Sequence, residues 1–403
     1  MDLRRNDGMT DDKSHKDMHT NRGKRLLRWS GFCLASLLAL LLILFIVEWM
    51  LAAYSFEEGG KAPYSITYNR RLHPPLWDET MTPGRDYLDK SEGLKAEPYR
   101  LATNKDGLIL GPRQYDRRSS LDSCDIMFFG GSTTECVFVR DSLRFPYRVG
   151  SLLSDSLKRE VVVLNVSMSS NHTFHSVSNL IHTCLPYRPR VAVLMHNIND
   201  LALLSKSGSY FDAPPGRGLT MRRGEPASLF SFIILRYFSN LNRIFNRSAI
   251  ELRKASVKLN GAEDEFHAWR MRTADTATVL KEYEKALRTF HGICEANGIR
   301  LVLMTQFNRL DETNRDLVVR YFGERDAPNF LRWMPVYDRI NRLLREYSEE
   351  NRLVCIDLDR LIPKSSMYIY DPVHLNNEGS RLAADIIAGR FLRSDTLMRA
   401  LAK

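Results

Sequence analysis

Residues 125–135 read DIMFFGGSTTE, an apolar run that passes directly into a glycine-rich turn. The apolar part, residues 125–129, predicts a buried strand, and Gly130 and Gly131 permit a sharp turn from that strand into a helix. Ser132 follows the glycines, so we expect its hydroxyl to be exposed at the end of the strand. Because phosphate-binding loops have the same form, this turn alone does not separate a nucleophile from a phosphate site.

Outward from this stretch, short apolar runs alternate with amphipathic segments. The predicted strands are residues 125–129, 161–166, 191–196, 300–305 and 353–358. The predicted helices are residues 142–159, 173–187, 274–296, 335–350 and 377–392. This alternation is typical of an α/β fold with a doubly wound parallel sheet, whose ligand site lies at the carboxyl ends of the strands.

A second motif, YDPVHLNNEG at residues 370–379, lies just before the last predicted helix. Asp371 stands three residues before His374 and can orient its imidazole, which can then take a proton from a serine across the site. The structural alternative is a loop carboxylate that caps the following helix. Chemistry is favoured because Ser132 and His374 both fall in loops at the carboxyl edge of one predicted sheet.

Two polar segments follow the strands predicted at 161–166 and 191–196. The segment NIND contains Asn199, whose side-chain amide can donate a hydrogen bond to an oxyanion. The segment NVSMSS can offer a backbone N–H to the same charge, from Ser170, or from Ser169 if the register shifts by one residue. Taken singly, each segment is an ordinary turn.

Together, in this order and each after a strand, the four motifs resemble those of the SGNH/GDSL hydrolases. The resemblance covers about residues 125–390, apart from an insertion at about 201–273. It implies a flavodoxin-like doubly wound sheet, the SGNH hydrolase fold. The departures are Gly-Gly-Ser-Thr in place of Gly-Asp-Ser-Leu at the first motif, and Asn197 and Ser170 where the family has glycine.

The same resemblance implies a role for each matching residue. Ser132 matches the nucleophile, His374 the base and Asp371 the residue that orients the base. The oxyanion hole implied by the resemblance consists of Ser132, Ser170 and Asn199. The expected reaction is acyl transfer through a serine ester, with no cofactor.

Two other functions stay open. If a sugar hydroxyl rather than water accepts the acyl group, the protein is an O-acyltransferase that modifies a polysaccharide, and the same triad serves both reactions. From a different class, the domain is a catalytically inactive carbohydrate-binding module, although the intact set of motif residues argues against it. A metal site is not expected, because the spacing of the nearby histidines matches no known metal motif: His172, His175, His182 and His196.

The N-terminal region predicts a single membrane anchor. Residues 29–47 carry no charge and are long enough as a helix to cross most of a bilayer. Basic residues precede this run and acidic residues follow it, which predicts a cytoplasmic N-terminus and an outer domain in a periplasmic or extracellular space. A cleaved signal peptide is the alternative, but the run is long for one and no A-x-A-like site follows.

The expected layout has four parts. They are a basic cytoplasmic tail at 1–28, the anchor at 29–54, a stalk and irregular lead-in at 55–120, and the hydrolase-like domain at 121–394. Five cysteines fall in the outer region, an odd number, so at least one thiol is free or pairs between chains.

The insertion has an excess of positive charge, with ten Lys or Arg against three acidic residues over 201–260. Its segment 229–245, LFSFIILRYFSNLNRIF, is apolar and predicts either a helix packed on the core or a membrane-lying helix that delivers substrate. The expected partners are the lipid bilayer and an acylated glycan or lipid, while nucleic acid is not expected outside the membrane.

Overall fold

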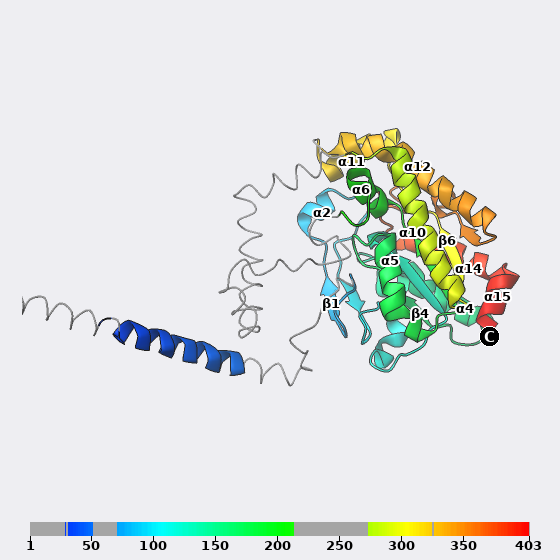
Figure 1. The fold of residues 1–403 in the computed structure, drawn as a ribbon. Coiled ribbons are helices and arrows are strands. Elements are labelled where there is room, and N and C mark those ends of the chain that lie inside the picture. The colour runs from blue at the N-terminus through cyan, green and yellow to red at the C-terminus, as the bar shows by residue number, and fades with distance from the viewer. Residues whose placement is uncertain (1–28, 30, 51–70, 213–272, 325, 403) are drawn as a thin grey trace, which may run out of the picture. The chain divides into compact units, whose positions relative to one another are not determined.

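The computed structural model describes residue 29 and residues 31–50, 71–212, 273–324 and 326–402. Within these residues one helix, Gly31–Met50, is long and apolar enough to cross a membrane, with a mean hydropathy of 2.6. It belongs to one of two compact units, and Figure 1 draws it in dark blue. The predicted basic tail and most of the predicted insertion, including residues 229–245, lie outside the described residues.

The other unit is built on a five-stranded parallel sheet. Its strands, in spatial order, are β4 (Val163–Asn165), β3 (Ile126–Gly130), β5 (Val191–Met195), β6 (Arg300–Met304) and β7 (Val354–Ile356). All four neighbouring pairs are parallel. This order confirms the predicted doubly wound α/β fold, and each strand lies within two residues of its predicted place.

Helices cover both faces of the sheet, because alternate strand residues bury toward opposite sides. Met127 and Phe129 pack toward one layer, whereas Ile126 and Phe128 pack toward the other. The first layer is formed by α5 (Thr173–Asn179), α6 (Ile198–Ser207), α10 (Thr276–Ala296) and α12 (Ala327–Glu350). The second is formed by α4 (Phe145–Leu157), α14 (Asn377–Leu392) and α15 (Asp395–Ala402).

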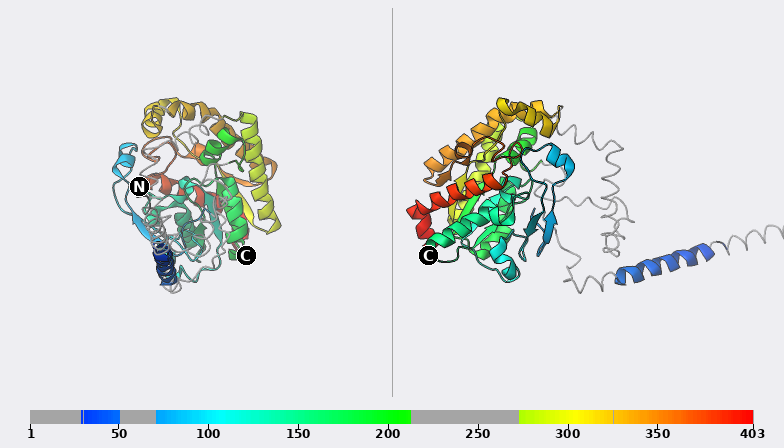
Figure 2. Two further views of the ribbon diagram at one scale, coloured as in Figure 1. Left: turned by 60° about the vertical axis from the view of Figure 1, so that its left-hand side comes forward. Right: turned by 180° about the vertical axis from the view of Figure 1, so that it is seen from behind.

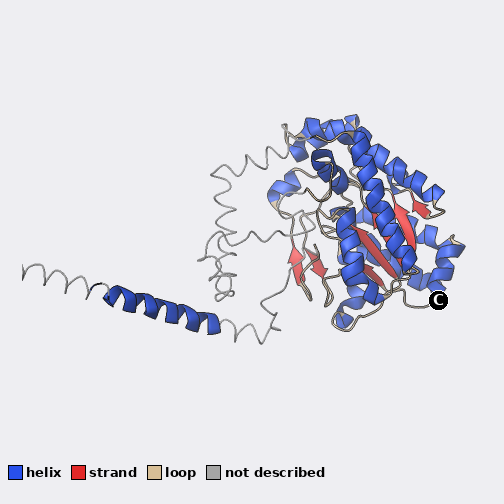
Figure 3. Ribbon diagram, in the orientation of Figure 1, coloured by secondary structure: helices blue, strands red, loops and turns tan. Residues whose placement is uncertain are grey.

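The two layers are visible from opposite sides. Figure 1 shows α5 and α10 over the sheet, and the view from behind in Figure 2 shows α14 and α4 over the other face. Figure 3 shows the strands between these helices. The aromatic contact between Phe129 and Phe290 of α10 joins one face to its layer at 5.1 Å between ring centroids. Replacing Phe129 with alanine is expected to cost about 3–5 kcal/mol of stability, since it empties a fully buried site.

Several helix boundaries differ from those predicted. The helix predicted at 173–187 ends as an α-helix at Asn179 and continues as a π turn, Leu180–Cys184, and a 3-10 turn, Leu185–Tyr187. The helix predicted to start at Pro335 begins at Ala327 and contains that proline in its interior. Proline is common in the first turn of a helix, which is why the helix was predicted to start at Pro335. In the structure the turns before Pro335 are also helical, and the buried side chain of Trp333 holds them against the core.

Beyond the lead-in, five α-helices among the described residues were not predicted. They are α3 (Ser132–Glu135), α6, α11 (Arg315–Phe322), α13 (Leu358–Leu361) and α15. Residues 197–200, interpreted as a turn after a strand, instead begin α6, with Asn197 at its N-cap position.

The lead-in was predicted to be irregular, and from residue 71 onward this is wrong. It contains an antiparallel pair, β1 (Asp78–Met81) and β2 (Tyr99–Ala102), and a short helix, α2 (Arg85–Asp89). Tyr99 and Leu101 are buried, and the N–H of Ile109 donates to the carbonyl of Asn165 on edge strand β4 at 2.8 Å. The lead-in therefore covers an edge of the sheet that would otherwise be open.

All six cysteines lie in the described part of the chain, and all are free thiols. Cys124, Cys136, Cys184 and Cys294 are buried. Burial raises the pKa of each of these four thiols, so they behave as small apolar side chains rather than as nucleophiles.

Candidate active site

The structure brings Ser132, His374 and Asp371 together at the carboxyl edge of the sheet. Ser132 is the first residue of α3, directly after β3, and its Oγ lies 2.8 Å from Nε2 of His374. Nδ1 of His374 lies 2.6 Å from Oδ2 of Asp371. The serine and the Asp-x-x-His motif stand about 240 residues apart in the sequence, yet they form one continuous hydrogen-bonded chain.

Asp371 is fully buried and is held by several donors. Its Oδ1 accepts from the backbone N–H groups of Val373 and His374, both at 2.8 Å. Its Oδ2 also accepts from the hydroxyl of Tyr87 at 3.1 Å. Burial alone would raise the pKa of Asp371, but the adjacent His374 and these backbone donors outweigh it, so the pKa lies below its usual range. The carboxylate is therefore kept ionised beside the imidazole.

His374 has the electrostatic setting of a general base. Burial by itself would lower the pKa of its imidazole, but the charge and hydrogen bond of Asp371, with a smaller contribution from Glu135, outweigh burial and raise the pKa. The ring also stacks on Tyr370, with 5.8 Å between centroids and 15° between planes. Its orientation toward Ser132 is thus fixed on both sides.

The two glycines before Ser132 are required by close packing rather than by an unusual dihedral angle. A Cβ on Gly130 would lie 2.1 Å from Oγ1 of Thr134. A Cβ on Gly131 would lie 2.2 Å from Nδ2 of Asn199. The absence of a side chain at Gly130 lets the serine turn pack against Thr134, and its absence at Gly131 lets Asn199 approach that turn.

Of the predicted oxyanion residues, Ser170 has the most informative backbone. Its φ is 65°, in the left-handed region that favours glycine, which is the residue of the family at this position. A serine in this conformation costs roughly 1–2 kcal/mol relative to glycine, which indicates that packing imposes it. Ser169 and Ser170 both line the cavity beside Ser132, so the structure leaves the predicted register alternative open.

Asn199 lies in the first turn of α6, against Gly131. Its Nδ2 donates to the backbone carbonyl of Asn171 at 2.8 Å, which leaves one N–H of the amide for another acceptor. Asn197, which replaces a family glycine, is buried and donates to the Tyr337 carbonyl and to Asn341 instead of facing the site. The oxyanion role of Asn199 stays a prediction.

A cavity of about 460 Å³ opens beside Ser132 and His374. Much of its wall comes from the lead-in, which supplies His73, Trp77, Met81 and Tyr87. Nothing in the sequence marks these residues as part of a site, because the lead-in holds only turn signals and no recognisable motif. Glu135 also lines the cavity, and its place three residues after Ser132 on one helical turn was the available signal.

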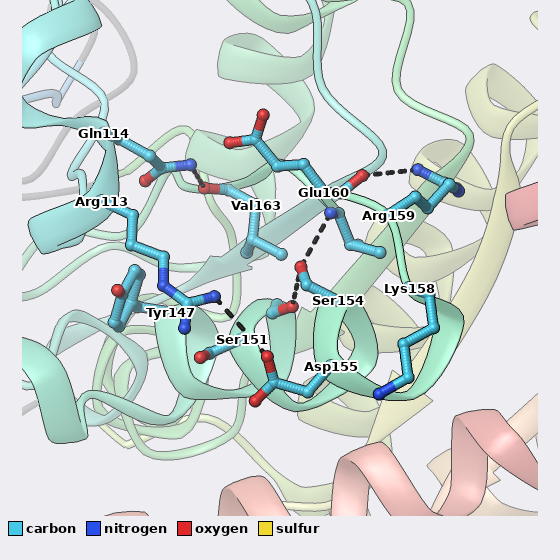
Figure 4. Close-up of a pocket in the computed structure, with 12 residues that line it drawn as sticks. Arg113, Gln114, Tyr147, Ser151, Ser154, Asp155, Lys158, Arg159, Glu160 and Val163 are labelled. Atoms are coloured by element: carbon cyan, nitrogen blue, oxygen red, sulfur yellow. Dashed lines mark hydrogen bonds and ion pairs between the residues drawn. The ribbon is translucent and has the colours of Figure 1, made fainter.

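A second cavity, of about 580 Å³, lies at the amino end of β4 and along α4 (Figure 4). Arg113 faces Asp155 there at 3.8 Å, and the hydroxyl of Ser154 lies between the Gly150 carbonyl and the Val161 N–H. These groups satisfy one another. The cavity is therefore a gap between surface elements at the edge away from Ser132.

The model of the GDSL-like lipase/acylhydrolase family matches residues 128–382. Among solved structures, the chain is similar to a catalytic mutant of an acetylxylan esterase from Geobacillus stearothermophilus, at 14% identity and a TM-score of 0.39, over 68% of this chain and 96% of that one. It is also similar to a GDSL-like lipase from Bacteroides thetaiotaomicron, at 11% identity and a TM-score of 0.35, over 68% of this chain and 88% of that one.

A comparison with curated proteins finds no match to this chain. The match to the family model nevertheless spans more than half of the chain and includes Ser132, Asp371 and His374. The chain therefore belongs to the GDSL-like lipase/acylhydrolase family, a family of ester hydrolases.

Proposed function

We propose that this protein is a membrane-anchored serine esterase that removes acyl groups from an envelope glycan or lipid outside the cytoplasm. The observation that carries this proposal is the unbroken chain from Ser132 through His374 to Asp371 at the mouth of a cavity. Membership of an ester hydrolase family supports the reaction class. The substrate is proposed from the predicted location of the domain.

In this proposal Ser132 Oγ attacks the carbonyl carbon of the ester while its proton passes to Nε2 of His374. The tetrahedral intermediate collapses, and His374 returns the proton to the departing alcohol oxygen, which leaves an acyl ester on Ser132. Water then attacks that ester and gives a proton to His374. When the carboxylic acid leaves, this proton restores the Ser132 hydroxyl.

Charge develops on the carbonyl oxygen in both tetrahedral intermediates. The proposed donors to it are the backbone N–H groups of Ser132 and Ser170 and the remaining amide N–H of Asn199. Ser170 N–H is supported by a left-handed backbone where the family has glycine, and Asn199 by its contact with the serine turn. Loss of one such donor typically lowers kcat by about 10²–10³.

The test is hydrolysis of p-nitrophenyl acetate by the full chain in detergent. Ser132→Ala and His374→Ala are each expected to lower kcat/KM by about 10⁴ or more, because residues that act as a unit lose function together. Ser156→Ala, an exposed serine on α4, is the matched control and should retain full activity. Retention of most activity by the His374 variant would mean that a different base acts.

The location is proposed from the apolar helix Gly31–Met50 and the basic residues that precede it. An excess of Lys and Arg on one side of a span keeps that side in the cytoplasm. A reporter enzyme that folds only outside the cytoplasm, fused after Lys403, is expected to be active. A reporter active only in the cytoplasm should be silent, and the reverse result would contradict the orientation.

A further inference from the structure

The cavity beside Ser132 contains a second histidine–carboxylate pair, whose histidine takes part in no step of the proposed reaction. Nε2 of His73 lies 2.7 Å from Oε1 of Glu135. The side chain of Glu135 is only 2% exposed and that of His73 only 9% exposed. Both residues line the same cavity as Ser132 and His374.

The contact with Glu135 places Nε2 of the His73 ring against a carboxylate oxygen. When Nε2 carries the proton toward the carboxylate, Nδ1 of a neutral imidazole has the free lone pair and acts as an acceptor. Glu135 in turn accepts from the hydroxyl of Ser169, beside the proposed oxyanion residue Ser170. The carboxylate therefore has contacts on both oxygens. In the tautomer with the proton on Nε2, its partner His73 has an acceptor nitrogen on a ring that lines the cavity.

The indole of Trp77 lies next to this pair and lines the same cavity. The rings of His73 and Trp77 are stacked, with 5.2 Å between centroids and 13° between planes. The backbone N–H of Trp77 donates to Thr103 at 2.9 Å, which anchors this part of the lead-in. A hydrogen-bond acceptor beside an indole face suits a ligand with one apolar face and a hydroxyl-bearing edge, which is the character of a sugar ring.

We infer that His73, Glu135 and Trp77 form a subsite for the sugar that carries the scissile ester. In this subsite Nδ1 of His73 accepts a hydrogen bond from a free sugar hydroxyl, while the sugar ring lies against Trp77. An apolar acyl chain is a poor occupant, because it offers no hydrogen-bond donor to Nδ1 of His73. The alcohol side of the ester therefore faces His73. This inference rests on the proposed esterase function and names its substrate class.

Two substrates with the same acetyl group test the subsite. Both 6-O-acetylglucose and p-nitrophenyl acetate give the same acetyl ester on Ser132, so they differ only in the alcohol that leaves. Only the glucose ester offers a hydroxyl to His73. The readout is the ratio of kcat/KM for acetylglucose to kcat/KM for p-nitrophenyl acetate, measured on the full chain in detergent.

His73→Ala is expected to lower this ratio about 30-fold, the range expected when one hydrogen bond in a substrate site is lost. Glu135→Gln should lower it less, about threefold to tenfold, because glutamine still offers an oxygen to Nε2. Free glucose should inhibit p-nitrophenyl acetate hydrolysis in the wild-type chain and lose this effect in the His73 variant. His182→Ala, an exposed histidine on another turn, is the matched control and should leave the ratio unchanged.

The outcomes separate the subsite from the esterase proposal. An unchanged ratio in His73→Ala, with both substrates falling together and a lowered melting temperature, would show that His73 only holds the lead-in and would overturn the subsite. Ser132→Ala is assayed beside it. If that variant still hydrolyses both esters, the proposed function fails whatever His73 does, whereas an inactive Ser132 variant with an unchanged His73 ratio removes the subsite alone.

Discussion

Among the described residues of this domain, two sets of serine, histidine and aspartate side chains differ in access to solvent. The open triad is Ser132, His374 and Asp371. The buried trio is Ser176, His196 and Asp200. In the buried trio the Ser176 hydroxyl lies 2.7 Å from Nε2 of His196, as close as the serine of the open triad lies to its own histidine. Nδ1 of His196, however, lies 3.7 Å from Asp200, against 2.6 Å in the open triad.

The electrostatics of the two sets are opposite. Burial, helped by the nearby His172, lowers the pKa of His196 to about 3, so its imidazole is neutral at physiological pH. Burial also raises the pKa of Asp200 to about 6, although Tyr210 and Thr173 donate to the carboxylate. All three side chains of the trio are 2% exposed or less. A serine, a histidine and an aspartate with a short serine–histidine distance are therefore not enough for a catalytic site. The site also needs a cavity for the substrate and an environment that stabilises the charged imidazolium.

The largest expected difference is in activity. Asp371→Asn should lower kcat/KM for p-nitrophenyl acetate by about 10⁴, because the amide supports the wrong tautomer of His374 and no longer stabilises its charged form. Asp200→Asn, the same substitution in the buried trio, should leave kcat/KM within about threefold. The measurement is kcat/KM for p-nitrophenyl acetate, determined for both variants beside the wild-type chain. Comparable losses in both would mean that the buried trio supports the chemistry and that the contrast is mistaken.

This contrast also shows what the sequence could predict. Ser132, Asp371 and His374 were predictable because each lies in a local pattern, a strand followed by glycines or an Asp-x-x-His before a helix. Parallel strands bring such patterns to one edge. The five strands were predictable for the same reason, since apolar runs such as residues 126–129 are buried on both faces of the sheet.

The rest of the site depended on contacts between distant segments. Tyr87 reaches Asp371 across 284 positions, and nothing in the lead-in marks it as part of a cavity. His73 and Trp77 are likewise placed only when the lead-in folds over the sheet edge. Asn199 was identified by motif, but its place in a helix was not, because NIND is too short to distinguish a turn from a helix start.

A smaller effect is expected on stability, and it depends on pH. The pKa of Asp200 is about 6 in the folded chain against an ordinary value of 3.8, so the folded state binds the proton more tightly than the unfolded state. The stability from this group is fully present below pH 3.8 and is lost as pH rises through 6. By this linkage the ionised carboxylate destabilises the fold at pH 8 by on the order of 2–3 kcal/mol.

Asp200→Asn should therefore stabilise the domain at pH 8 and lose about half of this advantage at pH 5, because pH 5 lies between the two pKa values of 3.8 and about 6. Asparagine keeps an oxygen for the Thr173 N–H and the Tyr210 hydroxyl, and its amide can donate toward Nδ1 of His196. The measurement is the free energy of unfolding by urea, at both pH values, for the wild-type chain and for Asp200→Asn. Asp155→Asn, which changes an exposed carboxylate, is the control. A difference in unfolding free energy that is the same at both pH values would contradict the assignment.

The smallest expected effect is a shift in the pH dependence of activity, and it tests why the imidazole of the open triad is so unlike that of the buried trio. The rate kcat/KM rises with pH as His374 loses its proton, and the raised pKa of this group places the midpoint above the ordinary value of 6.5. Glu135 is the minor of two carboxylates that raise it. Glu135→Gln removes that charge, so the pKa of His374 falls and the midpoint moves to lower pH.

The measurement is kcat/KM for p-nitrophenyl acetate from pH 5 to 9, with each curve normalised to its own plateau so that any change in plateau activity is removed. This ester offers no hydroxyl to His73, so loss of the proposed sugar subsite does not distort the curve. Glu160→Gln, a half-exposed carboxylate at the second cavity, controls for a general change in net charge and should leave the midpoint in place. Because burial and Asp371 are untouched, a shift in the Glu135 variant isolates one charge. A midpoint that stays fixed or moves to higher pH would mean that Glu135 does not stabilise the imidazolium, and that Asp371 alone separates the open triad from the buried trio.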